Sequence, residues 1–282
     1  GTTFIKANSN TNNIAIGTEA GENAQRTLAT AVGRQAGSTN QGNSAVAVGN
    51  QAGQTSQGAN SVAIGVLSGC GDQGTNSVGI GNAAGRTTQG THSVAVGYQA
   101  GETGQNNFAV AIGSNAGCRA QDGTVAIGTN AGRDGQGGSS VAIGPSAGCA
   151  SQGTNAVAIG DDAGLIGQNN YSIAIGTNAG CRAQDGAVAI GNNAGREEQG
   201  DSSVAIGPSA GCASQGTNAV AIGDDAGLIG QNNYSIAIGT NAGCRAQDGA
   251  VAIGNNAGRE EQGDSSVAIG PSAGCASQGT NA

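Results

Sequence analysis

The sequence predicts an all-β fold, a parallel β-solenoid of about seventeen repeats, each about 16 residues long. Three observations support this prediction. The motif V-A-I-G and its close variants recur along nearly the whole chain, and 55 of the 282 residues are glycines, most of which follow the same period. The chain has no Trp or Met and only five Phe and Tyr residues, so it cannot build the core of an ordinary domain.

The glycine that closes each V-A-I-G serves as an anchor for the repeat. Successive anchors lie about 16 residues apart, and three of the spacings are one residue shorter. A superrepeat of about 63 residues results, and the segment 139–201 recurs identically at 202–264. We therefore expect a lead-in at residues 1–12 and a single β-solenoid domain at 13–282, which we expect to be part of a longer array.

Each V-A-I segment predicts a short strand. Its two β-branched residues are two positions apart and share one face, while the alanine between them faces the other way. We expect the larger side chains, such as Val141 and Ile143 or Val204 and Ile206, to point into the core. A helical repeat is excluded because Gly and β-branched residues recur at every would-be turn.

Two further positions punctuate the repeat. A glycine follows every anchor by four residues, and a glutamine follows every anchor by eight. The residue after that glutamine is Gly, Asn or Asp in every repeat except at Arg26, which predicts a tight turn with positive φ at this position.

The recurring glutamine predicts a ladder of side-chain amides, because stacked rungs place like residues about 4.8 Å apart. We interpret the column as structural rather than as a row of ligand-binding groups. Its members are Gln25, Gln41, Gln57, Gln73, Gln89, Gln105, Gln121, Gln136, Gln152, Gln168, Gln184, Gln199, Gln215, Gln231, Gln247, Gln262 and Gln278.

The seven cysteines each follow the second glycine of a repeat, and the last six occur in every second repeat. With one repeat per turn, successive members would be about 9.5 Å apart, too far for a disulfide within the chain. With two repeats per turn, the spacing of about 4.8 Å would allow one. Both geometries stay open, so the column predicts either disulfides within the chain or thiols that are free or paired with a neighbouring chain. Its members are Cys118, Cys149, Cys181, Cys212, Cys244 and Cys275, with Cys70 preceding them.

No catalytic, cofactor-binding or metal-binding residue is predicted. There is one His and no C-x-x-C pair, and the net charge of −8 without a basic cluster argues against nucleic acid. No apolar run is long enough to span a membrane. The pairs Asp161–Asp162 and Glu197–Glu198 and their later copies are interpreted as solvated surface. Phe108, Tyr171 and Tyr234 share one position and would either cap the strand or form a row of contacts for a partner.

The S-V-A-I-G-x-x-A segment with its trailing G-x-N resembles the head repeat of YadA-like trimeric autotransporter adhesins, and similar repeats are found in fibre proteins of phages and giant viruses. The resemblance implies a homotrimeric, non-enzymatic rod on a cell or virion surface that serves attachment or display, with a host-surface or matrix ligand as partner. End-to-end filaments are a second form of self-association. The alternatives are a solenoid that binds ice or another surface, and a carbohydrate-active β-helix.

Overall fold

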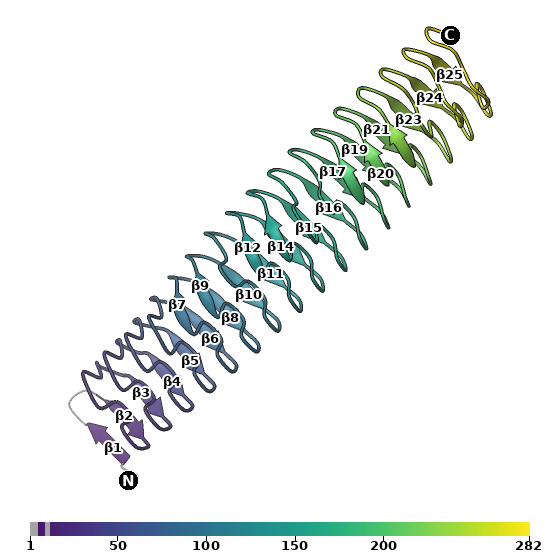
Figure 1. Ribbon diagram of the computed structural model, residues 1–282. Helices are drawn as coiled ribbons and strands as arrows, with labels where there is room; N and C mark the ends of the chain where they lie inside the picture. The colour runs from purple at the N-terminus through teal and green to yellow at the C-terminus, as the bar shows by residue number, and fades with distance from the viewer. Residues whose placement is uncertain (1–4, 9–11) are drawn as a thin grey trace. The chain divides into compact units, whose positions relative to one another are not determined.

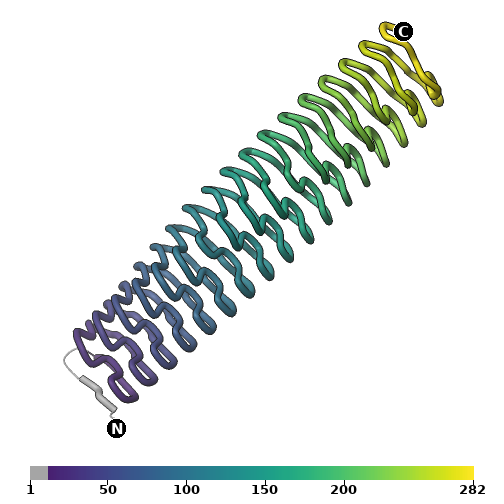
Figure 2. The backbone as a smooth tube through the Cα atoms, in the orientation of Figure 1, coloured from purple at the N-terminus to yellow at the C-terminus, as the bar shows by residue number. Residues whose placement is uncertain are grey.

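The structure, a computed structural model, describes the backbone of residues 5–8 and all of residues 12–282. The chain divides into two compact units, Gly1–Ser139 and Ser140–Ala282. Within each unit the backbone winds as a stack of similar loops (Figures 1 and 2). The described residues form strands and turns and contain no helix.

In the first unit, the V-A-I segments form one parallel sheet in which equivalent residues of successive repeats pair directly, as Val46 does with Val62. Its strands are β2 (Asn13–Ile16), β3 (Thr30–Val32), β4 (Val46–Val48), β5 (Val62–Ile64), β6 (Val78–Ile80), β8 (Val94–Val96), β10 (Val110–Ile112) and β11 (Val125–Ile127). A lead-in strand, β1 (Ile5–Asn8), pairs antiparallel with β2. The opposite wall contains β7 (Thr87–Gln89), β9 (Thr103–Gln105) and β12 (Asp134–Gln136).

The second unit repeats this plan. Its V-A-I sheet contains β13 (Val141–Ile143), β15 (Val157–Ile159), β16 (Ile173–Ile175), β17 (Val188–Ile190), β19 (Val204–Ile206), β21 (Val220–Ile222), β23 (Ile236–Ile238), β24 (Val251–Ile253) and β25 (Val267–Ile269). Its opposite wall contains β14 (Ala150–Gln152), β18 (Glu197–Gln199), β20 (Ala213–Gln215) and β22 (Ile229–Gln231).

These pairings confirm the predicted parallel β-solenoid. Within each unit, each V-A-I strand pairs with the V-A-I strand of the very next repeat, as Val157 does with Ile173 and Ile173 does with Val188. One repeat is therefore one turn, and the geometry with two repeats per turn is wrong.

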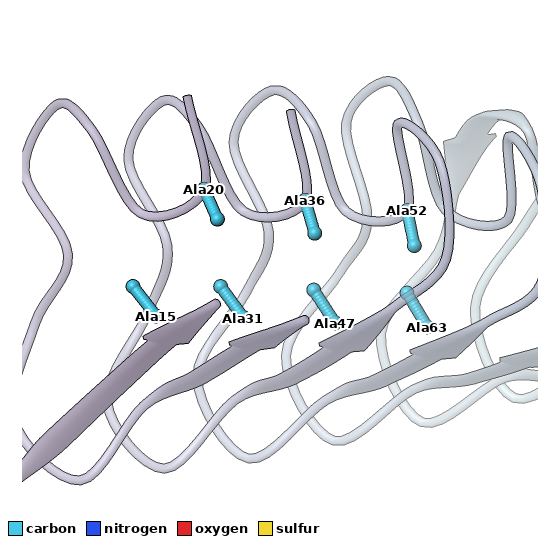
Figure 3. Packing of buried hydrophobic residues seen from close by; sticks show 7 residues of the cluster. All are labelled: Ala15, Ala20, Ala31, Ala36, Ala47, Ala52 and Ala63. Atoms are coloured by element: carbon cyan, nitrogen blue, oxygen red, sulfur yellow. The ribbon is translucent and has the colours of Figure 1, made fainter. Parts of the chain in front are cut away.

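The predicted orientation of the strands is also wrong. The central alanines, such as Ala142 and Ala205, are fully buried, whereas the flanking Val141, Ile143, Val204 and Ile206 are only half-buried. Figure 3 shows the reason: the strand alanines point across the interior toward a second row of alanines. In the first turns these two rows are Ala15, Ala31, Ala47 and Ala63 facing Ala20, Ala36 and Ala52. Walls this close leave room for methyl groups but not for β-branched side chains.

One pair of substitutions shows how narrow the interior is. Ser68 stands where every other repeat has Ala, and Gly79 stands at the inward position of the next strand, where every other repeat also has Ala. A Cβ on Gly79 would lie 2.9 Å from the Ser68 Oγ atom. The hydroxyl added at one position thus occupies the space of the methyl group missing from the other.

Glycine is required where the backbones of two successive solenoid turns come close together. Gly160 has φ +133°, and a Cβ there would lie 2.6 Å from the carbonyl oxygen of Gly176 in the next turn. The predicted positive φ after the glutamine is wrong: at Gly153, for example, φ is not positive. The left-handed residue in β14 is Ser151, which precedes the glutamine instead.

Candidate functional site

The most extensive surface feature is the face of the V-A-I sheet that points away from the core. We call it the outer apolar face. It consists of the two residues that flank the central alanine, or Gly79, in each V-A-I strand. These strands are β2–β6, β8, β10 and β11 in the first unit and β13, β15–β17, β19, β21 and β23–β25 in the second. Apart from Thr30, all of its residues are Val or Ile. Exposed fractions in the first unit are 38% at Ile64 and Ile112 and 45% at Ile14, and most other members of the face are half-buried. Each unit therefore presents a continuous row of partly exposed aliphatic side chains.

The glutamines that face the core form side-chain hydrogen bonds along the stack. Gln41 Nε2 donates to Gln57 Oε1 at 3.1 Å and also to the carbonyl oxygen of Thr30 at 2.8 Å. In the second unit, Gln152 Nε2 donates to Gln168 Oε1 at 3.3 Å, and Gln168 Nε2 donates to the Val157 carbonyl at 2.8 Å. Each of these buried amides therefore links its own loop to a strand, and the paired ones link one turn to the next.

Three members of the predicted ladder are placed elsewhere, and for these the prediction is wrong. Gln121 and Gln184 are exposed and Gln247 is half-buried, and each belongs to one of the three turns that are one residue shorter than the rest, which we call the short turns. There the preceding alanine, Ala120, Ala183 or Ala246, is fully buried in the place of the glutamine. The Gln184 side chain instead accepts a surface hydrogen bond from Asn169 Nδ2 at 2.9 Å. Because each short turn has one residue fewer, the side chain that faces the core comes one position earlier in the sequence, at the alanine before the glutamine.

The short turns interrupt the ladder. Gln199 Oε1 and Gln262 Oε1 are buried without a hydrogen-bond partner among the described residues. Each follows a short turn in which alanine provides no amide donor. Gln152 Oε1 and Gln215 Oε1 also lack a partner in the described part of the chain, so the side-chain bond is not made between every two long turns. The contribution of the ladder to stability stays a prediction.

Each of the seven cysteines is present as a thiol rather than in a disulfide. Because one repeat is one turn, successive cysteines of the second unit, from Cys149 onward, are two turns apart, about 9.5 Å. This is beyond the reach of a disulfide within one stack.

The thiols nevertheless differ in environment. Cys118, Cys181 and Cys244 lie in short turns, and an arginine follows each of them. Cys70 and Cys212 lie in long turns. Burial raises the pKa of the Cys70 thiol above its ordinary value of 9.0, although Arg86 acts in the opposite direction. Burial likewise raises the pKa of the Cys212 thiol, and Glu197 and Asp225 add to the shift while Arg196 opposes it.

Phe108 in the first unit and Tyr171 and Tyr234 in the second, which we call the aromatic row, lie on the surface. Phe108 is 62% exposed, and Tyr171 and Tyr234 are each 66% exposed. All three have positive φ, between 57° and 59°, a conformation that disfavours bulky side chains. The His92 ring stacks on Phe108 with 5.2 Å between ring centroids. Tyr171 and Tyr234 thus combine backbone strain with little burial.

The paired acidic residues are at the surface, as at Asp161 and Glu198. Among residues 5–8 and 12–282, no group of three or more His, Cys, Asp or Glu side chains is arranged to hold a metal ion. That part of the chain also contains no helix long and apolar enough to cross a membrane.

Two turns of the first unit, which include β6, β7 and β8, carry the decisive similarity to known proteins. A model of the YadA head domain repeat matches residues 73–100 in two copies. Residues 73–100 resemble YadA head repeats. This match confirms the resemblance inferred from the S-V-A-I-G segment, and the β-solenoid with one repeat per turn fits an adhesin-like surface fibre. A search of curated proteins gave no match.

The sequence contained a signal for the outer apolar face that composition alone obscures. The central strand residue is alanine in every repeat except at Gly79, whereas the flanking positions exchange Val, Ile and, once, Thr. A position that accepts only the smallest side chains is the sterically confined one.

Proposed function

We propose that this chain is a non-enzymatic rod that associates with copies of itself and is exposed on a cell or virion surface, where it serves attachment or display. The observation that carries the proposal is the outer apolar face. Monomeric proteins rarely expose contiguous apolar surface beyond a few hundred Å², and larger patches mark interaction sites. The resemblance to YadA head repeats favours a homotrimer as the assembly.

The distribution of charge supports this assignment of faces. No charged residue lies in the V-A-I strands from β3 to β25. On the opposite wall, β18 carries Glu197 and Glu198, both exposed. Because charged side chains are costly to bury and apolar ones are costly to expose, the charged wall suits solvent and the aliphatic face suits a second copy.

We place contacts with a host-surface or matrix ligand on the aromatic row. Replacing Tyr171 and Tyr234 by Asn, the residue at the same position in the turn before each of them, relieves strain at positive φ. We expect the double variant to be at least as stable as the parent and to bind less to cells and matrix-coated surfaces. Equal binding by the parent and the double variant would show that the aromatic row does not contact the ligand.

The experiment on self-association compares two sets of substitutions, each with one substitution in each of the same three S-V-A-I-G repeats. The first set places glutamates on the outer apolar face: Ile143→Glu, Ile206→Glu and Ile269→Glu. The control set places them on the opposite wall: Ser151→Glu, Ser214→Glu and Ser277→Glu. Natural glutamates already occupy that wall position at Glu198 and Glu261.

Multi-angle light scattering gives the result. We expect the parent and the control set to form an oligomer, near three times 26.7 kDa for a trimer, and the first set to give 26.7 kDa with its β-type circular dichroism retained. A monomeric parent would contradict the proposal. An oligomer in the first set as large as the parent would show that another surface joins the copies.

A further inference from the structure

Two surface cavities with the same lining lie at the short turns of the second unit. Their volumes are about 350 and 270 Å³. The first is lined by Asp162, Leu165, Asn178, Cys181, Arg182, Arg196 and Glu197, and the second by Asp225, Leu228, Asn241, Cys244, Arg245, Arg259 and Glu260. We call them the Cys181 notch and the Cys244 notch.

The hollow follows from the length of the short turn. Ala183 replaces a glutamine at the inward position, so the short turn encloses a smaller interior than the turns on either side of it. Leu165 and Arg196 come from those two flanking turns, and Cys181 comes from the short turn between them. One deleted residue therefore produces a depression with a thiol in its lining.

The two arginines of the Cys181 notch are available to a ligand. Within residues 12–282, Arg182 and Arg196 form no ion pair, whereas Arg133, at the position equivalent to Arg196 in the preceding superrepeat, pairs with Asp134 at 2.9 Å. Two guanidinium groups suit carboxylates, and Asp162 and Glu197 suit an ammonium group. The Leu165 side chain adds an apolar contact.

The geometry points to a modification site: we propose that Cys181 and Cys244 undergo thiol–disulfide exchange with zwitterionic disulfides of amino acids or short peptides. The thiolate of Cys181 attacks one sulfur of the small disulfide, a new S–S bond forms to the protein, and the original S–S bond breaks. The released half leaves as a thiolate and takes up a proton. The cysteine sulfur is oxidised and the released half is reduced.

The size of the notch fits this class of ligand. The volumes of about 350 and 270 Å³ lie just above and just below the lower limit of about 300 Å³ for small-molecule pockets, which suits one half of such a disulfide. Arg182 and Arg196 would hold the carboxylates while the sulfur meets Cys181. This inference is independent of the proposed rod function.

Cys212 provides an internal comparison. It lies in the same column but in a long turn, and Ala213 follows it in place of an arginine. Burial raises the pKa of its thiol, so a smaller fraction is thiolate at neutral pH.

The test treats the reduced full chain with glutathione disulfide, blocks the remaining thiols by alkylation, and follows the glutathionyl mass on each cysteine by peptide mass spectrometry. We expect Cys181 and Cys244 to react about tenfold faster than Cys212. The variant Arg182→Gln with Arg196→Gln should slow Cys181 about tenfold. Cys244 in the same molecule should keep its rate, which shows that the fold is intact.

Bis(2-hydroxyethyl) disulfide, which is neutral, provides the control reagent. It should react with Cys181 at the same rate in the parent and in the double arginine variant, because it has no carboxylate to bind. The proposal would be overturned by an unchanged glutathione disulfide rate in the variant, by an equal slowing with the neutral reagent, or by Cys212 reacting as fast as Cys181.

Discussion

The turn that begins at Gly160 and the turn that begins at Gly176 differ in length by one residue, and this difference reorganises the interior. In the longer turn Gln168 is fully buried and bonds to the strand carbonyl of Val157. In the shorter turn Ala183 is buried and Gln184 is exposed, although both turns have glutamine at the same distance from their anchors. Distance around the loop, and not residue type, decides which side chain faces the core.

The shorter turn also closes more tightly. In a long turn, a Cβ on the second glycine would collide with the buried glutamine, as at Gly148, where it would lie 2.7 Å from Gln152 Oε1. At Gly180 in the short turn, the collision is with the Ala174 methyl group at the same 2.7 Å. The strand and the loop have moved together to fill the space that a glutamine side chain would occupy.

The largest effect should come from Gln168→Ala. This change removes the hydrogen bonds to Val157 and Ser172 and the acceptor for Gln152, and it leaves a cavity in a long turn. We expect a loss of about 2–4 kcal/mol in the free energy of unfolding, measured in urea.

The matched control in the short turn is Gln184→Ala. Since the Gln184 side chain is exposed, we expect a change within about 0.5 kcal/mol. Equal losses at the two positions would mean that the two turns do not differ as described.

The smallest effect concerns the thiol of Cys212 in a long turn. Its folded pKa lies above the ordinary value of 9.0, so above pH 9 the unfolded state loses its proton before the folded state does. The contribution of the protonated thiol to stability is therefore complete below pH 9 and lost as the pH rises through the folded pKa. Cys212→Ala should reduce the fall in thermal midpoint between pH 8 and about pH 10.5. A steeper fall in the variant would contradict this sign.

The period, the strands and the parallel stacking could be predicted from the sequence because each depends on local spacing. The orientation of the strands could not, since alternation in V-A-I shows that two faces exist but not which one is inside. Hydrophobicity alone favours an inward position for Val141. The core is too narrow there for a β-branched side chain, so Ala142 faces inward instead. The position of Gln184 depends on a length difference between neighbouring turns, which acts only once the turns are stacked.

The notches could be predicted only in part, because their residues come both from one turn and from the turns stacked on it. The sequence shows that Cys181 precedes Arg182, but Leu165 and Arg196 reach the same cavity from neighbouring turns. Their convergence follows from having one repeat per turn, which the sequence left open.

The central claim is that the middle residue of each strand points into the interior, at a place only as wide as two facing methyl groups. A cycle of Gly79→Ala, Ser68→Ala and the double variant tests it most directly, by free energy of unfolding. We predict that Gly79→Ala alone destabilises by about 1–3 kcal/mol and that adding Ser68→Ala restores most of the loss, because the pair then matches every other repeat. If Gly79→Ala instead stabilises the protein by about 0.5–1 kcal/mol, as expected for an exposed strand glycine, and is independent of Ser68, the alanines do not form the core.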